Sequence, residues 1–258
     1  MNKGVCKFCG GEKELIKAHI IPRNFYINYK QDKYRSVDLN TGKWEQRQCG
    51  AYDKNILCSD CDNGVFKEFD DEGYRILLQE CKNHTEKIYN NSILYHFKKK
   101  DFNYLLLRKF FISILWRASI SNIEEFKFVN LGKYEELAKQ ILLGNSNNAN
   151  LFNVIIFKSP NNKKFNKIVS IQKGRFYSAT TYTIFMASFN IVVIINDSGL
   201  PLTVKNIFNQ LFLSENELYI LETEEIYEDK MQYFYKIIKR ANLILERRLN
   251  ARSNRSRL

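Results

Sequence analysis

The spacing of apolar positions changes along the chain, and this change predicts the order of its secondary-structure elements. Residues 102–121 are apolar on nearly every face of a helix, which is typical of a buried helix. Residues 134–143 predict a shorter helix that ends at Gly144. After the polar run 145–150, β-branched residues separated by polar turns predict strands. We expect these strands at 151–157, 168–172, 191–195 and 217–221, with a short helix at 207–211.

The N-terminal third of the chain is more polar and predicts a different order of elements. Residues 15–21 are β-branched near their end, which favours a short strand. A turn signal at 40–42 precedes a strand-like segment around Trp44, and apolar residues over 65–79 recur at helical spacing. The order is therefore strand, loop, strand, helix. The chain as a whole is predicted to be α+β with two units, residues 1–85 and residues 86–258, the second ending in a long helix over 224–249.

Length and hydropathy place the protein outside the membrane. A chain of 258 residues with 45% hydrophobic content can bury one large core or two small ones. The longest apolar run, 104–116, is interrupted by Arg108 and Lys109 and is shorter than the roughly 20 residues of a membrane span. The first residues lack the apolar region of a secretory signal. We therefore expect a soluble cytoplasmic protein.

The net charge of +12 favours a polyanionic partner. Nucleic acid comes first, DNA before RNA, and an anionic membrane surface second. A coding bias toward Lys, Asn and Ile would produce the same charge. The arginine-rich C-terminus (Arg247, Arg248, Arg252, Arg255 and Arg257) either follows a DNA backbone or is a solvated terminus.

Four of the six cysteines form two Cys-x-x-Cys pairs, and two such pairs supply the four thiolates of a tetrahedral zinc site. The pairs are Cys6 with Cys9 and Cys58 with Cys61. The alternative is two unrelated pairs of reduced cysteines. The other two, Cys49 and Cys81, are read as ordinary buried cysteines, and the segment 81–84 as a helix end rather than a ligand pair.

The arrangement around these pairs resembles the HNH, or ββα-metal, endonucleases. The resemblance covers about residues 5–80 and rests on three segments that follow in the family's order, Cys6-Lys7-Phe8-Cys9-Gly10, His19-Ile20-Ile21-Pro22 and Leu57-Cys58-Ser59-Asp60-Cys61. It implies an N-terminal ββα-metal module held together by a structural zinc. It also implies that the histidine between the pairs is not a zinc ligand.

The resemblance further implies the roles of three side chains. His19 is the general base, since a neutral imidazole accepts a proton from the attacking water; the alternative is a core or zinc-ligand histidine. Asp62, with Asn63 beside it, is the ligand of a catalytic Mg²⁺ or Mn²⁺, or else a helix N-cap. Asp53 stands where the family has an asparagine that holds the loop under the base, and Asn55 competes for that role.

Ala18 departs from the family, many members of which carry a second metal ligand just before the base. Asp70 and Asp71 could substitute for it, or could belong to a solvated acidic helix face. Arg23 follows the His-Ile-Ile-Pro segment and either binds a phosphate of the nucleic acid or is a surface arginine.

The expected function is metal-dependent hydrolysis of phosphodiester bonds in DNA. The resemblance also points to effectors of bacterial anti-phage defence systems, in which a protein partner would release the nuclease. The alternative is a catalytically inactive zinc module that binds nucleic acid or a protein partner within a larger complex, and Ala18 is its main support.

Overall fold

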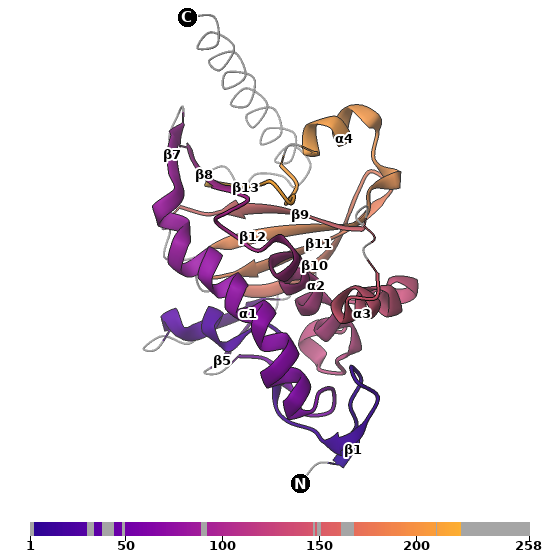
Figure 1. The fold of residues 1–258 in the computed structure, drawn as a ribbon. Coiled ribbons are helices and arrows are strands. Elements are labelled where there is room, and N and C mark those ends of the chain that lie inside the picture. The colour runs from indigo at the N-terminus through magenta and orange to yellow at the C-terminus, as the bar shows by residue number, and fades with distance from the viewer. Residues whose placement is uncertain are drawn as a thin grey trace, which may run out of the picture.

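The fold was obtained as a computed structural model of the full chain (Figure 1). The structure describes residues 3–29, 34–37, 44–47, 50–88, 92–146, 148, 151–160, 168–209 and 211–222. The predicted long helix over 224–249, the arginine-rich C-terminus and Cys49 lie outside these residues.

A mixed sheet forms the centre of the described chain, and it is larger than the sequence predicted. Its strands are, in spatial order, β5 (Trp44–Arg47), β4 (Tyr34–Val37), β10 (Ile168–Phe176), β11 (Ala179–Met186), β12 (Phe189–Asn196), β9 (Leu151–Lys158), β13 (Glu217–Glu222), β8 (Ser92–Lys98) and β7 (Thr85–Ile88). The pairs β4–β10 and β9–β13 are parallel, and the other neighbours are antiparallel. The strands expected in β9, β10, β12, β13 and around Trp44 are confirmed, whereas β4, β7, β8 and β11 were not anticipated.

Helices cover both faces of the sheet (Figure 1). They are α1 (Lys67–Tyr74), α2 (Tyr104–Ile120), α3 (Glu135–Leu143) and α4 (Leu202–Phe208). Because side chains alternate along a strand, Val154 and Ile156 of β9 belong to the core that contains α2, whereas Ile155 and Phe157 pack in the smaller core that contains α4. The short helix expected at 207–211 corresponds to α4, which begins earlier, at Leu202, and ends at Phe208.

The apolar helix predicted at 102–121 is confirmed as α2, which is buried on nearly all sides. It lies between α1 and the sheet and also contacts α3. The helix α3 ends at Gly144, as predicted, because Gly144 has φ of +84°, a conformation that glycine adopts without steric cost. Within the described residues, no helix is both long and apolar enough to cross a membrane.

The N-terminal region consists of two short ribbons followed by a helix. The ribbons are β1 (Lys3–Val5) with β2 (Glu12–Glu14), and β3 (Ala18–His19) with β6 (Tyr52–Asp53). The helix predicted over 65–79 is confirmed and is longer, since widened turns at Cys61–Phe66 and Arg75–Glu80 extend α1 in both directions. Short 3₁₀ segments occur at Arg23–Tyr29, Cys81–His84, Glu124–Phe126, Gly132–Tyr134 and Asp197–Gly199. The segment 81–84 is thus a helix end, as predicted.

The loop between β3 and β6 links the N-terminal region to the large sheet. This loop carries β4 and β5, and β4 pairs with β10 through Arg35 opposite Ile168. One continuous hydrophobic core contains residues from both sides of the boundary predicted at residue 85, among them Phe66 and Trp116. The boundary itself stays a prediction.

Candidate functional site

The two Cys-x-x-Cys pairs are presented by two different local structures. The first pair occupies the turn between β1 and β2, where Gly10 has φ of +75° and donates its N–H to the carbonyl of Cys6 at 2.8 Å. Gly10 is suited to this turn because a side chain is disfavoured at positive φ. The second pair lies at the start of the helix, where the Asp62 N–H donates to the Cys58 carbonyl at 3.0 Å. A turn and a helix start thus face each other.

All four thiols converge. The Sγ atoms of Cys6, Cys9, Cys58 and Cys61 lie within 4.8 Å of one another. Tetrahedral zinc with Zn–S bonds of about 2.3 Å requires Sγ atoms about 3.8 Å apart, and those of Cys9 and Cys58 are separated by 4.0 Å. The four cysteines can therefore hold a metal ion such as zinc. In the described part of the chain, no second group of three or more His, Cys, Asp or Glu ligand atoms comes together in this way.

The backbone favours the thiolate form at one of the four cysteines, Cys6, whereas burial raises the pKa of the Cys58 and Cys61 thiols. The Cys58 N–H donates to Cys6 Sγ at 3.4 Å. Burial raises the pKa of the Cys6 thiol, but hydrogen bonds from the backbone of Cys9, Cys58 and Phe8 outweigh that effect and bring the pKa down to about 7. Cys81, by contrast, is buried away from this group, and burial raises its pKa to about 12. It fits the expected role of an inert core cysteine.

His19 and Asp53 lie on neighbouring strands of the β3–β6 ribbon. Ala18 is the register partner of Asp53, and His19 is the partner of Tyr52. The Asp53 carboxylate is 4% exposed and accepts three hydrogen bonds, from the Asn55 N–H at 2.8 Å, the Ser121 hydroxyl at 2.7 Å and the Asn122 N–H at 3.2 Å. Asp53 therefore holds the loop after β6 and ties it to the end of α2.

The His19 ring is half-buried and lies edge-on to the ring of Tyr52, with centroids 6.0 Å apart. Burial lowers the pKa of His19, and the positive charges of Arg117 and Arg23 lower it further. The imidazole is thus neutral at pH 7 and can accept a proton. Arg23 itself is exposed at the start of a 3₁₀ segment, so a cationic side chain accompanies the histidine at the surface.

Asp62 and Asn63 lie in the first widened turn of the helix, directly after the second cysteine pair. Asp62 is half-buried, and burial raises the pKa of its carboxyl group, an effect that Arg117 opposes and Asp70 reinforces. Asn63 is exposed, and its amide donates to the Ser59 hydroxyl at 3.0 Å. Asp62 is not the N-cap, because the helix begins before it, at Ser59.

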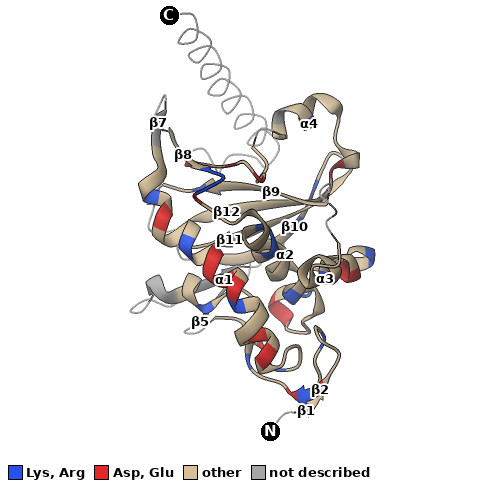
Figure 2. Ribbon diagram, viewed as in Figure 1, with Lys and Arg blue, Asp and Glu red and all other residues tan. Residues whose placement is uncertain are grey.

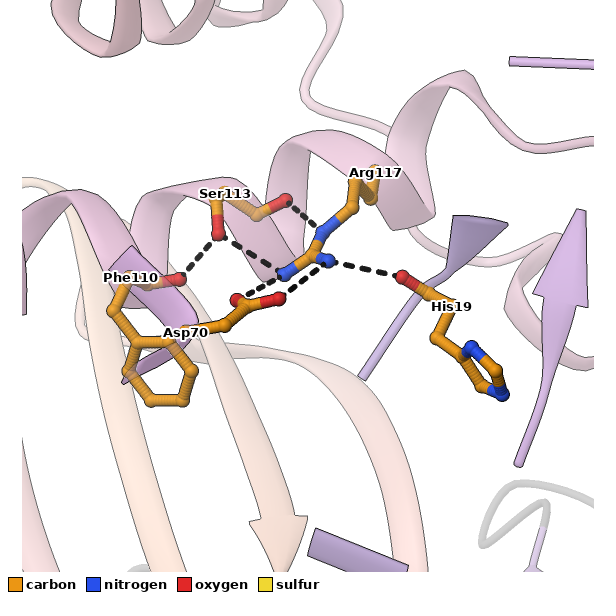
Figure 3. Close-up of polar contacts among 5 residues, drawn as sticks. All are labelled: His19, Asp70, Phe110, Ser113 and Arg117. Atoms are coloured by element: carbon orange, nitrogen blue, oxygen red, sulfur yellow. Dashed lines mark hydrogen bonds and ion pairs between the residues drawn. The ribbon is translucent and has the colours of Figure 1, made fainter. Parts of the chain in front are cut away.

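Asp70 and Asp71, the residues suggested as substitutes for a metal ligand at position 18, differ from each other in their surroundings on α1. Ala18 is fully buried, and Asp71 is exposed on α1. Asp70 is partly exposed but is not free, since both of its carboxylate oxygens accept hydrogen bonds from Arg117, at 2.8 and 3.2 Å (Figure 3). Arg117 thus occupies about two of the four lone-pair sites of the carboxylate, and its positive charge opposes a metal ion at this place.

Sequence reasoning missed Arg117, Ser113 and Ser121, all on or next to α2. A signal for Arg117 was present, because an arginine inside a helix that is apolar on every face must find a buried partner. Its guanidinium donates to Asp70, to Ser113 and to the His19 carbonyl. No signal existed for Ser121, whose partner Asp53 is distant in the sequence.

No protein-family model matches this chain, and neither a curated protein nor a solved structure matches it.

Proposed function

We propose that this chain is a metal-dependent endonuclease of the HNH type that hydrolyses phosphodiester bonds in DNA. The observation that carries the proposal is a neutral histidine on a short ribbon that leads into a helix anchored by four convergent thiols. In this proposal the ribbon and the helix form a ββα module, in which His19 is the base and the four thiols hold a structural metal. The zinc, bound by Cys6, Cys9, Cys58 and Cys61, would fix the start of the helix relative to the β1–β2 turn.

In this proposal His19 removes a proton from the attacking water. The low pKa of the imidazole, caused by burial and by Arg117 and Arg23, keeps the base unprotonated at pH 7. The hydroxide then attacks phosphorus, the bond to the leaving 3′ oxygen breaks, and that oxygen takes a proton from solvent, giving 3′-hydroxyl and 5′-phosphate ends. Asp53 supports the ribbon, and Arg23 would contact a phosphate of the nucleic acid.

Asp62, with Asn63 beside it, would hold Mg²⁺ or Mn²⁺. When bound, such an ion neutralises charge on the phosphate and assists the leaving oxygen. Mg²⁺ commonly binds through only one or two carboxylates together with water and substrate phosphates. This preference accommodates both the alanine at position 18 and the engagement of Asp70 by Arg117.

The decisive experiment is plasmid cleavage by the zinc-loaded chain with Mg²⁺ or Mn²⁺. His19→Ala is expected to abolish cleavage, and His84→Ala is the matched control, because His84 is also partly buried and instead stacks on Phe97 at a centroid distance of 4.1 Å. Asp62→Asn is compared with Asp71→Asn on the exposed side of α1. Equal behaviour of wild type and His19→Ala across metals and across DNA and RNA substrates would contradict the proposal.

The second candidate function is a zinc module that binds nucleic acid or a protein partner without cleaving. Two observations favour it, namely the buried alanine beside His19 and the engagement of Asp70 by Arg117. Figure 2 also shows basic and acidic residues interspersed on several elements of the described chain, α1 among them. This candidate predicts salt-dependent binding with no cleavage under any metal.

An effector role in bacterial anti-phage defence, in the cytoplasm and with an activating protein partner, is part of the first proposal and derives from the resemblance. It predicts that a protein isolated with the chain from the native host raises the cleavage rate above the basal rate of the purified chain.

A further inference from the structure

The side chain of Arg117 is the most heavily engaged charged group near the candidate site. It is 1% exposed. Its guanidinium donates to both carboxylate oxygens of Asp70, to the backbone carbonyl and hydroxyl of Ser113, and to the backbone carbonyl of His19 at 3.0 Å (Figure 3). It also lies over the ring of Phe66, with the guanidinium carbon 5.3 Å from the ring centroid. One buried side chain thereby joins α1, α2 and β3.

Arg117 contacts His19 at the backbone carbonyl and leaves the imidazole ring available for other contacts. In Figure 3 the His19 carbonyl points toward Arg117, while the imidazole points away from it. The two-residue strand β3 has few backbone hydrogen bonds of its own to fix its orientation. A hydrogen bond from a rigid, fully buried donor to the carbonyl of the same residue therefore restricts the direction in which the imidazole leaves the backbone.

Arginine suits this position better than lysine would. The guanidinium is planar and has five N–H donors in a fixed fork, which allows it to bind the Asp70 carboxylate with two bonds and still reach the His19 carbonyl. A lysine ammonium is a single point with three donors on a flexible stem. It could keep the charge but not this set of simultaneous contacts, and it would not stack on Phe66.

We propose that Arg117, itself held by Asp70, is a positioning residue of the site, acting on His19 through the backbone carbonyl of that histidine. The inference rests on the proposed function, in which His19 is the base. It also means that the ββα unit depends on α2, a helix beyond the unit predicted to end at residue 85. The end of α2 holds Asp53 as well, through Ser121.

A matched control exists on the same helix. Arg108 is 6% exposed, and it donates to two backbone carbonyls, those of Asn148 and Leu151, at 2.6 and 2.8 Å. These carbonyls belong to the segment that enters β9 and not to the candidate site. Arg108→Lys and Arg117→Lys thus each replace a buried guanidinium that donates to backbone carbonyls, and of the two only Arg117 contacts His19.

The experiment compares the two lysine variants in the full, zinc-loaded chain. Arg117→Lys is expected to lower kcat roughly a hundredfold with KM changed about twofold at most, because a displacement of the base of about 1 Å has this effect on the chemical step. Arg108→Lys is expected to keep kcat within about threefold of the wild-type value, even if its thermal unfolding midpoint falls as far as that of Arg117→Lys. Equal losses of kcat in both variants, or an unchanged kcat in Arg117→Lys, would overturn the inference.

A second readout separates this inference from the proposed function. The ¹⁵N signals of the His19 ring, assigned with His19→Gln, report its tautomer and its titration without any need for cleavage. The charged groups that act on this ring are Arg117 from α2 and Arg23 from the 3₁₀ segment. Arg117→Lys should move the signals and the titration midpoint toward those of a free histidine, whereas Arg108→Lys should match the wild type.

If the wild type cleaves no substrate, the proposed function fails, and the ring signals alone decide the positioning role. A change that is confined to Arg117→Lys supports the role. Ring signals that are the same in Arg117→Lys and wild type show that Arg117 serves only stability.

Discussion

The close approach of α1 and α2 gives a prediction about Gly73 in which two effects of opposite sign compete. Replacing a glycine inside a helix by alanine stabilises that helix by about 1 kcal/mol. At Gly73, however, an added Cβ would lie 2.5 Å from two carbon atoms of the Phe110 ring, far inside normal contact distance. The ring cannot easily retreat, since Phe110 is fully buried and stacks on Phe25 at a centroid distance of 5.5 Å.

The steric cost should exceed the gain in helix propensity. Overpacking a buried site costs about 1–3 kcal/mol and occasionally more, and contacts of 2.5 Å with an immobile ring place Gly73 at the upper end of that range. We therefore expect Gly73→Ala to lower the free energy of unfolding by about 2 kcal/mol after the helix gain of about 1 kcal/mol is subtracted.

Gly64 provides the control, because it lies in the same helical segment with open space around the position of a Cβ. There only the helix term acts, and Gly64→Ala should raise the free energy of unfolding by about 0.5–1 kcal/mol. Urea unfolding of the zinc-loaded protein measures both. A Gly73→Ala protein that is as stable as wild type would refute the argument that Phe110 determines the distance between α1 and α2.

Three further predictions concern the buried charges and the thiols. Arg117→Met and Asp70→Asn should each lower the free energy of unfolding by about 3–5 kcal/mol, because each leaves its partner in the ion pair uncompensated. The double variant should recover much of this loss, and additive losses in urea titrations would contradict the prediction. Burial and positive charge lower the pKa of His19, so the unfolded chain binds a proton more readily than the folded chain. The stability of the wild type should therefore fall as pH drops from about 7 through the folded-state pKa. His19→Gln should lose less stability over that range. Cys58→Ser should reduce the bound zinc, measured by elemental analysis, from one ion per chain, while Cys81→Ser should leave it unchanged.

The sequence predicted the parts of this protein that depend on local patterns. Helix α2 was predicted because a run that is apolar on every face is stable only when buried, and the end of α3 because Gly144 adopts a positive φ without strain. The convergence of the four cysteines was predictable from their spacing, since two Cys-x-x-Cys pairs suit one metal ion. His19 and Asp53 lie on the same two-stranded ribbon, and the roles that the resemblance implies for them remain proposals.

Pairings between distant segments were decided only by the tertiary structure. The parallel pairing of β4 with β10 has no local signature, and so the large sheet was underestimated. The same holds for the contacts of Arg117 with His19 and Asp70, and of Asp53 with Ser121, which lie 98, 47 and 68 residues apart in the sequence. A sequence shows that a buried arginine needs hydrogen-bond acceptors, but packing selects them, since Arg117 binds the Asp70 carboxylate whereas Arg108 binds backbone carbonyls. The amino-acid pattern alone thus determined the cysteine cluster, whereas the docking of α2 determined which side chain contacts the backbone of His19.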